Sequence, residues 1–396
     1  MRILYLLLIV QTAIGQSILP SAYPDRIILN LGADASRSVG VNWRTDIHQK
    51  DGWVQFAKAS TGTQFLSQLD SLKSTTTLLN FEEGQALYHS AMIRGLEPGN
   101  SYVYRVGNGP YRSEWFQFTL PAKELTFIYF GDAQNDVKNH WSRVIRKSIT
   151  HNPDFILHGG DLINRHNRDP EWAEWFAAGS FIHASIPSAM TPGNHEFGKG
   201  VNNLSAHWKA QFSLPENGPD TLTETSYSIH FEDMVLGVLD ATMMYDSKEL
   251  EKASMQWLDG VFSRSKQKWK VVLVHFPLYS TKANRDNTDL RNALLPVLEK
   301  HNVDLILQGH DHSYGRGIMN KNNHDMAFVV SNAGPKMYPA GEDKTWMQKK
   351  GDFIQNYQVI KINNDQLEYQ AFTADGALFD QFVLQKKGEK STWIKN

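Results

Sequence analysis

Five short blocks rich in metal-binding side chains follow one another along the chain, and nearly every block comes directly after an apolar run. Strand ends that deliver carboxylate, amide and imidazole groups to one place form a pocket for two cations. Two cations about 3.5–4 Å apart polarise a phosphoryl group and activate a bound water near neutral pH. The pattern therefore predicts hydrolysis of a phosphate ester. The blocks are GDAQ at 131–134, GDLIN at 160–164, GNHE at 193–196, VHFP at 274–277 and GHDH at 309–312.

The residue types within the blocks suggest how two cations would share their ligands. Asp161 is the candidate bridging carboxylate, because it opens a loop directly after a predicted buried strand. Asp132 is a candidate terminal ligand of the first cation, with His312 beside it. The second cation is assigned to Asn194, His275 and His310.

Histidines have two different tasks in this hypothesis. His310 and His312 are two residues apart, so in an extended segment their side chains lie on the same side and one strand end serves both cations. His195 follows the candidate ligand Asn194 and can point toward the substrate. An imidazole at that place suits proton donation to a leaving oxygen, which makes His195 the candidate general acid.

The segments that must position these blocks begin after residue 121, where predicted strands alternate with predicted helices. This alternation indicates a layered α/β fold, in which ligands bind beyond the carboxyl ends of the strands. A charged tail at 386–395 is expected to be frayed. The predicted strands are 125–130, 155–158, 187–191, 235–239, 269–274, 304–307, 357–362, 367–372 and 378–384, and the predicted helices are 137–150, 171–178, 247–263 and 290–301.

Residues 24–121 have an all-β pattern of short runs separated by Gly, Pro and Asn, which predicts a β-sandwich with Trp43, Tyr102 and Tyr104 in its core. The segment holds no cluster of catalytic residue types, so we interpret it as a structural or docking domain. The predicted fold class is therefore α/β, with an N-terminal β-sandwich followed by a layered α/β domain at 122–386. The predicted sandwich strands are 26–31, 38–43, 53–57, 86–93, 101–106 and 114–118.

The amino-acid composition excludes some kinds of metal site and gives no support for nucleic-acid binding. The formal net charge of the 396-residue chain is -2, which gives no global electrostatic case for nucleic-acid binding. The sequence has no cysteine, so thiolate metal sites and disulfides are excluded and any metal is held by oxygen and imidazole ligands. The expected partner is a small-molecule phosphate ester, and the oligomeric state is left open.

The N-terminus has the pattern of an export signal at 1–15. Arg2 precedes a short apolar stretch at 4–10, and small residues at 13–15 form a cleavage pattern before Gln16. We expect a secreted or periplasmic protein, the alternative being an ordinary N-terminal strand or anchor. No later segment reaches about 20 apolar residues, so no membrane span is predicted.

The blocks, in this order and spacing, resemble the calcineurin-like metallophosphoesterase superfamily, and most of all a purple-acid-phosphatase-type enzyme. The segment GHDHSYGR at 309–316 matches the last block of that superfamily. The resemblance covers about residues 26–384. It implies a fibronectin-III-like domain in front of a catalytic domain that uses two divalent or mixed-valence metal ions, Fe, Zn or Mn.

Two positions depart from the family pattern. Asn164 stands where the family usually has a metal-binding tyrosine, whose bond to ferric iron causes the purple colour, so we predict a colourless enzyme with Asn164 as a weak ligand or a turn residue. Gln134 stands where many members have a ligand histidine. A glutamine carbonyl oxygen can bind a hard cation, so Gln134 is either a metal ligand or an ordinary loop amide.

Three functions fit the sequence. The leading hypothesis is a secreted acid-phosphatase-like phosphomonoesterase, with metal-bound water as nucleophile and His195 as general acid. The second is a phosphodiesterase or nucleotide pyrophosphatase at the same site, which Gln134 favours by its resemblance to nucleotide-cleaving relatives. The third is a non-catalytic surface-binding protein.

Several other residues near the blocks are expected to have structural roles. We expect ordinary loop and strand roles for His158, His166 and His183. We expect core packing for Trp172, Trp175 and Phe176.

Overall fold

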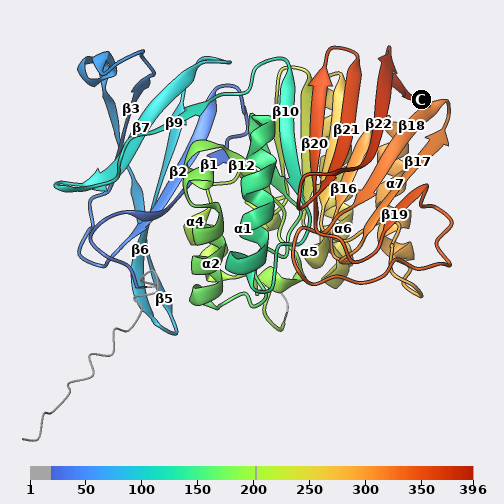
Figure 1. Cartoon of the computed structure of the whole chain (residues 1–396), viewed down its shortest axis with the longest axis horizontal. Coiled ribbons are helices and arrows are strands. Elements are labelled where there is room, and N and C mark those ends of the chain that lie inside the picture. The colour runs from blue at the N-terminus through green and yellow to red at the C-terminus, as the bar shows by residue number, and fades with distance from the viewer. Residues whose placement is uncertain (1–18, 201–202, 396) are drawn as a thin grey trace, which may run out of the picture.

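The computed structural model describes residues 19–200 and 203–395. The predicted export signal at 1–15 lies outside these residues. Within the described ranges, no helix is both long enough and apolar enough to cross a bilayer. The molecule is elongated, with the N-terminal strands at one end and the C-terminal strands at the other (Figure 1). The predicted fold class is confirmed, because β-sandwich sheets precede a layered α/β fold.

The N-terminal part consists of two facing groups of antiparallel strands. Trp43 and Tyr104 come from opposite groups and are buried in the core between them, as the sequence predicts. The Thr-rich strand β5 and the short strands β4 and β8 were not predicted, because each is largely exposed and lacks an apolar alternation. One group contains β1 Asp25–Leu31, β2 Ser38–Thr45, β6 Gly84–Arg94 and β5 Thr75–Phe81, and the other contains β4 Asp70–Lys73, β3 Trp53–Lys58, β7 Ser101–Asn108, β8 Tyr111–Arg112 and β9 Phe116–Thr119.

An 11-stranded sheet runs through the whole molecule. Its order is β23-β22-β21-β20-β10-β11-β12-β1-β2-β6-β5, so the sandwich strand β1 continues the sheet of the α/β part. The join is a parallel pairing of Asn30 with Ser188. The strands that follow the sandwich in this sheet are β10 Leu125–Phe130, β11 Phe155–His158, β12 Ser188–Met190, β20 Asn356–Asn363, β21 Gln366–Thr373, β22 Leu378–Lys387 and β23 Lys390–Ile394.

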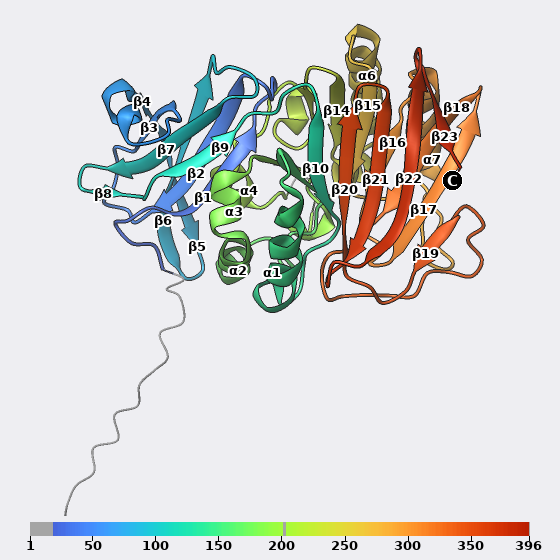
Figure 2. The same ribbon diagram turned by 45° about the horizontal axis from the view of Figure 1, so that its top comes forward.

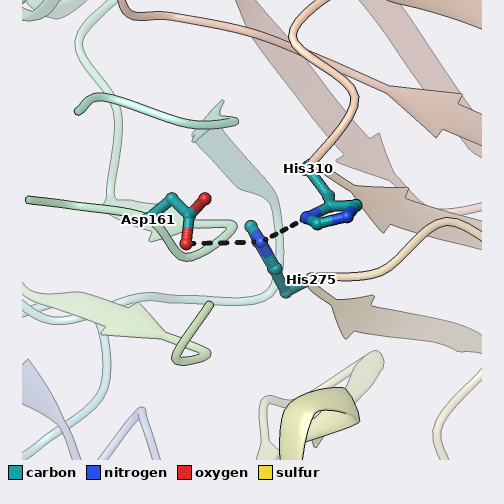
Figure 3. Close-up of side chains that lie close together, drawn as sticks. All are labelled: Asp161, His275 and His310. Carbon is teal, nitrogen blue, oxygen red and sulfur yellow. Dashed lines mark hydrogen bonds and ion pairs between the residues drawn. The ribbon is translucent and has the colours of Figure 1, made fainter. Parts of the chain in front are cut away.

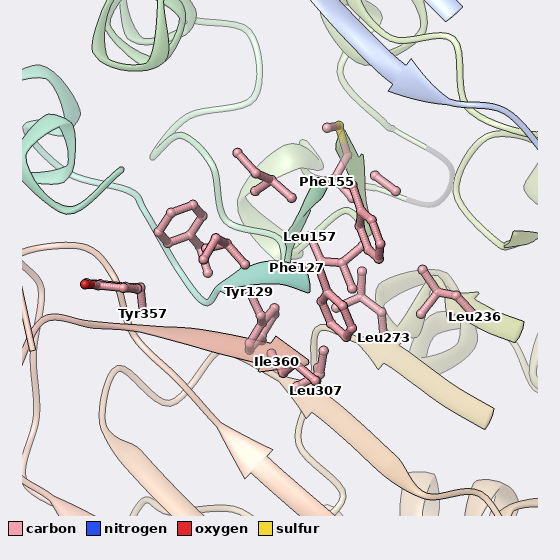
Figure 4. Close-up of a cluster of buried hydrophobic side chains, with 14 of the residues drawn as sticks. Phe127, Tyr129, Phe155, Leu157, Leu236, Leu273, Leu307, Tyr357 and Ile360 are labelled. Carbon is pink, nitrogen blue, oxygen red and sulfur yellow. The ribbon is translucent and has the colours of Figure 1, made fainter. Parts of the chain in front are cut away.

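A 7-stranded sheet, β13-β14-β15-β16-β18-β17-β19, packs against the α/β part of the first sheet. Phe127, Phe155, Leu236 and Leu273 belong to the core between the two sheets (Figure 4). Within this second sheet, β14, β15, β16 and β18 run parallel to one another. Its strands are β13 Tyr227–His230, β14 Met234–Leu239, β15 Trp269–Val274, β16 Leu305–Gln308, β17 Tyr314–Lys321, β18 His324–Val330 and β19 Lys349–Gly351.

Helices α1 and α2 cover the outer face of the first sheet near β10, whereas α6 and α7 lie behind the second sheet (Figure 2). Trp141 of α1 and Trp175 of α2 pack on the first sheet, whereas Leu258 of α6 and Leu294 of α7 pack on the second. The predicted helices are all present, and the short α3, α4 and α5 are additional. The bounds are α1 Val137–Ser148, α2 Asp169–Gly179, α3 Phe181–Ser185, α4 Ala206–Gln211, α5 Ala241–Asp246, α6 Lys248–Arg264 and α7 Thr288–Lys300.

The prediction of a frayed tail at 386–395 is wrong, because this segment ends β22 and forms β23. Lys386 is 5% exposed and its Nζ donates a hydrogen bond to the buried carboxylate of Asp304. Ser391 donates to the same carboxylate through its Oγ, and its backbone N–H donates to His324 Nδ1 at 2.9 Å. The charge pattern suggested solvation, but the partner of the lysine is a buried carboxylate far away in the sequence.

Candidate metal centre

The metal-binding blocks converge at the carboxyl ends of parallel strands from both sheets. Strands β10, β11 and β12 are parallel neighbours in the first sheet, and β15 and β16 are parallel neighbours in the second. Each strand is followed by one block. Because the two sheets stack face to face, side chains from both meet at this end. The residues that come together are Asp132, Gln134, Asp161, Asn194, His275, His310 and His312, which we call the cluster.

Asp161, His275 and His310 form the middle of the cluster and point toward one another (Figure 3). One ligand atom from each of the three lies within 4.8 Å of the other two. His275 Nε2 is 3.4 Å from Asp161 Oδ1 and 3.3 Å from His310 Nδ1. Asn194 adds its Oδ1 at 3.3 Å from the same His275 nitrogen. The side chains assigned to a second cation therefore lie together.

Asp132, Gln134 and His312 form the other side of the cluster. Asp132 Oδ2 is 3.6 Å from His312 Nδ1. Gln134 Nε2 donates a hydrogen bond to Asp161 Oδ2 at 2.7 Å and lies 3.5 Å from His312 Nε2. The two carboxylate oxygens of Asp161 thus face different partners, His275 and Gln134. This is the arrangement that a bridging carboxylate needs.

The oxygen atoms of the cluster fit a cation. Asp132 Oδ2 and Gln134 Oε1 are both buried, and neither has a hydrogen-bond partner within the described part of the chain. A buried polar atom without a partner costs free energy unless something else satisfies it. The donor set consists only of carboxylate, amide and imidazole groups, which suits Zn, Mn or Fe. The residues present therefore fit two metal ions.

The electrostatics of the cluster favour positive charge. Burial raises the pKa of Asp132 to about 8, and repulsion by Asp161 adds to this effect. Burial alone would lower the pKa of His275, but the carboxylates of Asp161 and Asp132 raise it to about 10. The potential at His275 is therefore negative. Burial and the neighbouring His275 lower the pKa of His310 to about 2, which keeps this imidazole neutral, the form that binds metals.

Several cluster residues have left-handed backbone conformations. The φ angles are 51° at Asp161, 72° at His310 and 56° at His312, a region that costs free energy for residues other than glycine. The prediction that His310 and His312 share an extended segment is wrong. Turns in the left-handed region, rather than strand alternation, bring both imidazoles to the cluster. One contact that holds this turn is the backbone N–H of His310, which donates to Asp132 Oδ1 at 3.0 Å.

Glu196 holds the loop that carries Asp161, a role that the sequence did not reveal. Its Oε2 accepts hydrogen bonds from the backbone N–H groups of Asp161 at 2.9 Å and Gly193 at 2.7 Å. Its Oε1 accepts from Leu162 N–H at 2.8 Å. Glu196 is completely buried, and its carboxylate links the GDLIN block to the GNHE block. Its position inside the GNHE block was the only signal that could have identified it.

Asp311 holds the GHDH loop in place through hydrogen bonds to the segment at 280–285. Its Oδ2 accepts hydrogen bonds from Ser280 Oγ and from the backbone N–H of Thr281, both at 2.7 Å. Arg285 Nη1 donates to Asp311 Oδ1 at 2.6 Å. The acid between the two candidate ligand histidines therefore binds the loop that follows His275. It fastens the ends of β15 and β16 to each other.

The backbone at Gly193 approaches the cluster closely. A Cβ atom added there would lie 2.2 Å from Asp161 Oδ1 and 2.7 Å from His275 Cε1. Neither atom can retreat without leaving the cluster. Glycine is therefore required by the close approach and is more than loop punctuation.

His195 lies beside the cluster with a defined orientation. Its Nδ1 is 2.7 Å from the backbone oxygen of Asn164, and its Nε2 is 3.9 Å from Asp161 Oδ2. A carbonyl oxygen can only accept, so Nδ1 carries a hydrogen and Nε2 is the atom that faces Asp161. The side chain is 26% exposed, so Nε2 can reach a bound molecule.

His158 and His183 pack in the core together with tryptophans. The rings of His183 and Trp175 stack with centroids 4.0 Å apart, and His158 lies 5.4 Å from the same tryptophan. Burial lowers the pKa of His183 to about 3. Trp172, Trp175 and Phe176 are buried, as predicted. These aromatic residues support α1 and α2.

Two protein families and several known proteins are similar to this chain. Residues 125–314 match the calcineurin-like phosphoesterase family, and residues 24–120 match the purple acid phosphatase N-terminal domain. Acid phosphatase type 7 from Mus musculus is 25% identical over 307 residues, covering 67% of this chain and 66% of the relative. Fe(3+)-Zn(2+) purple acid phosphatase 12 from Arabidopsis thaliana is 25% identical over 320 residues, covering 74% and 65%. The chain thus spans about two thirds of the length of these curated relatives.

A solved structure has the same fold. Purple acid phosphatase PPD1 from yellow lupin (Lupinus luteus) seeds superposes with a TM-score of 0.74 over 93% of this chain and 75% of that chain. The sequence identity is 18%, so this likeness bears on the fold alone.

Proposed function

We infer that this chain hydrolyses phosphate monoesters with two metal ions. The premise is that it belongs to the calcineurin-like metallophosphoesterases and carries the N-terminal domain of purple acid phosphatases. The observation that carries the proposal is the convergence of the cluster around Asp161. Its carboxylate contacts both sides of the cluster, and buried oxygens of Asp132 and Gln134 lack partners within the described residues.

Each side of the cluster would hold one cation, with Fe, Zn and Mn as the candidates. Two bound cations would polarise the phosphoryl group and supply an activated water as nucleophile. The protein keeps their ligands in place through Glu196 and Asp311, which fasten the loops from behind. Asp132, Gln134 and His312 would hold one cation, Asn194, His275 and His310 would hold the other, and Asp161 would contact both.

His195 is the proposed general acid. In the protonated imidazole both nitrogens donate, and the Asn164 carbonyl already accepts from Nδ1. This hydrogen bond holds the ring in one orientation. The Nε2–H then donates its proton to the leaving oxygen of the ester, and a neutral imidazole remains.

The purified enzyme should be colourless even with iron bound. Asn164 has no phenol group, and the contacts it makes are through its backbone oxygen to His195 and its backbone N–H to Glu171 Oε2 at 2.8 Å. An absorption spectrum of the iron-loaded protein checks this prediction. A visible band from tightly bound ferric iron would show that the role assigned to Asn164 is wrong.

A substrate panel tests the proposed reaction. After reconstitution with Mn, Zn or Fe, the protein should hydrolyse 4-nitrophenyl phosphate faster than bis(4-nitrophenyl) phosphate, and Asp161→Asn should abolish both activities. Preference for the diester would instead support a phosphodiesterase or nucleotide pyrophosphatase at the same site. Absence of hydrolysis with every metal would favour a non-catalytic surface-binding protein.

Export is part of this proposal, since the pattern at 1–15 is that of a cleaved signal. The first residue of the protein recovered from a secreting host tests it. A mature chain that begins at Gln16 supports export, and a chain that retains Met1 inside the cells speaks against it.

A further inference from the structure

An aromatic pair lies beside the cluster on the side of His275 and His310. Phe276 directly follows His275, and its ring centroid is 4.4 Å from that of His310 and 5.4 Å from that of His275. Tyr245 meets Phe276 edge to face, with centroids 6.2 Å apart and an interplanar angle of 86°. The two rings thus lead outward from the cluster.

Tyr245 is strongly exposed although its helix is well anchored. Its side chain is 75% exposed, whereas Met243 and Met244 on the same short helix α5 are buried. The carboxylate of Asp240, at the end of β14, caps this helix by accepting from Met243 N–H at 3.0 Å. The backbone therefore holds the tyrosine in place while its ring contributes little to the core.

A single exposed aromatic residue needs no explanation in itself. This one is separated from a candidate metal ligand by one ring, that of Phe276. An aromatic surface next to a phosphate site is suited to a planar group, because stacking is tolerant of the ring's identity. An anionic or purely aliphatic group lacks the flat π-face that stacking requires, so it would gain less from the two aromatic rings.

We propose that Tyr245 and Phe276 form a stacking shelf for the planar aromatic group of a phosphate ester whose phosphoryl group lies at the cluster. This inference rests on the proposed phosphoesterase function and names its substrate class. The shared chemistry is an aromatic ring joined to phosphate, as in aryl phosphates and nucleotides. Phe276 is near enough to the cluster for a ring attached directly to the ester oxygen, whereas Tyr245 is placed for a base that a ribose holds farther out.

The test compares adenosine 5′-phosphate, phenyl phosphate and glycerol phosphate in the metal-loaded full chain. For Tyr245→Ala, kcat/KM for adenosine 5′-phosphate relative to glycerol phosphate should fall about 5- to 150-fold, because stacking contributes roughly 1–3 kcal/mol per base. The loss should appear mainly in KM. Tyr245→Phe, which keeps the ring, should restore the ratio. A loss confined to the nucleotide identifies a base at Tyr245, and a loss that includes phenyl phosphate identifies an aryl group.

Two further variants make the result specific. Tyr111→Ala removes an exposed aromatic residue from the sandwich, and the ratio should not change. Tyr338→Ala removes a ring on the opposite side of the cluster, 5.5 Å from His312. A fall in the ratio for Tyr338→Ala with none for Tyr245→Ala would overturn the proposal. An unchanged ratio in Tyr245→Ala, or an equal loss for all three esters, would overturn it as well.

The proposal of a stacking shelf and the proposal of phosphate-ester hydrolysis can be tested independently of each other. If the wild-type protein hydrolyses none of the esters, the reaction is wrong, and calorimetric binding of adenosine 5′-phosphate then decides about the shelf. Binding that weakens in Tyr245→Ala and recovers in Tyr245→Phe supports it. Binding that is absent, or equal in all variants, overturns it.

Discussion

Asp161 is the side chain on which both sides of the cluster depend. Its Oδ1 accepts a hydrogen bond from His195 N–H at 2.9 Å and lies near His275, while its Oδ2 accepts from Gln134. Burial alone would raise the pKa of Asp161, but His275 and His195 lower it below its usual range. Asp161 therefore stays ionised, as a bridging ligand must.

The role of His195 can be separated from that of the cluster. His195→Ala should lower kcat by about 10²–10⁴, the usual contribution of a general acid, because no group then protonates the leaving oxygen. Steady-state kinetics and elemental analysis of the same preparation check this. Metal content should equal that of the wild type and of the exposed control His48→Ala. A variant that loses metal would show that His195 acts as a ligand.

For individual residues, the sequence predicted which side chains form the cluster better than it predicted their backbone conformations and hydrogen bonds. The order of the blocks after predicted strands was enough to bring Asp132, Asp161 and His275 together, because parallel strands end at the same edge. The left-handed backbone at His310 could not be foreseen, since a positive φ is uncommon at any residue other than glycine, even though histidine adopts it more often than most. The role of Glu196 depends on backbone N–H groups of a loop that only the folded chain brings to it.

Among the elements, helix α2 is connected to the proposed general acid through the loop at Asn164. Glu171, in its first turn, accepts hydrogen bonds from the backbone N–H groups of Asn164 and Arg165, each at 2.8 Å. The carbonyl of Asn164 in turn accepts from His195 Nδ1. The helix thus fixes the loop that orients the imidazole.

Substitution of Glu171 should therefore disturb the acid without affecting the metals. Glu171→Ala should lower kcat about tenfold, because a small misplacement of a catalytic group is costly. Glu171→Gln, which keeps one acceptor oxygen, should recover part of the loss. Kinetics across pH and metal analysis check both variants. An unchanged kcat in Glu171→Ala would mean that α2 only supports the fold.

The elements that the sequence predicted well have strong local patterns. The apolar runs of β10 and β15 are fully or almost fully buried, as continuous runs in parallel sheets usually are. Strand β23 was missed because its pattern is polar and its partners are distant. Its backbone pairs with β22, and Trp393 N–H donates to Asp325 at 2.7 Å.

In the molecule as a whole, a buried ionic network ties the sandwich to the α/β part. Arg26 of β1 donates to both carboxylate oxygens of Asp169 at 2.7 Å, and Arg44 and His207 approach the same carboxylate at 3.4 and 3.2 Å. Asp169 is completely buried at the start of α2. The pairing of β1 with β12 joins the two parts through the shared sheet, and this network joins them through side chains.

The network predicts a pH-dependent contribution to stability. Burial alone would raise the pKa of Asp169, but His207 and Arg26 lower it to about 2 in the folded chain. A lowered folded pKa stabilises the fold above the unfolded pKa of about 3.9, and this stabilisation is lost as the pH falls toward 2. Asp169→Asn should therefore lower the free energy of unfolding by about 3–5 kcal/mol at pH 7, as expected when one partner of a buried pair is removed.

Denaturant unfolding of the metal-free wild type and Asp169→Asn, at a series of pH values, measures this effect. The difference between the two proteins should shrink between about pH 4 and pH 2, where the wild-type carboxylate becomes protonated. A difference that stays constant down to pH 2 would contradict the assignment of the charge to Asp169.

The location of bound metal tests the central claim most directly. Anomalous diffraction from crystals of the full chain loaded with Mn or Zn should show two peaks per molecule, one on each side of Asp161. The first peak should lie beside Asp132 and His312 and the second beside His275 and His310, and Asp161→Asn should weaken both. A single peak, a peak elsewhere, or none at all would contradict a two-metal centre in this chain.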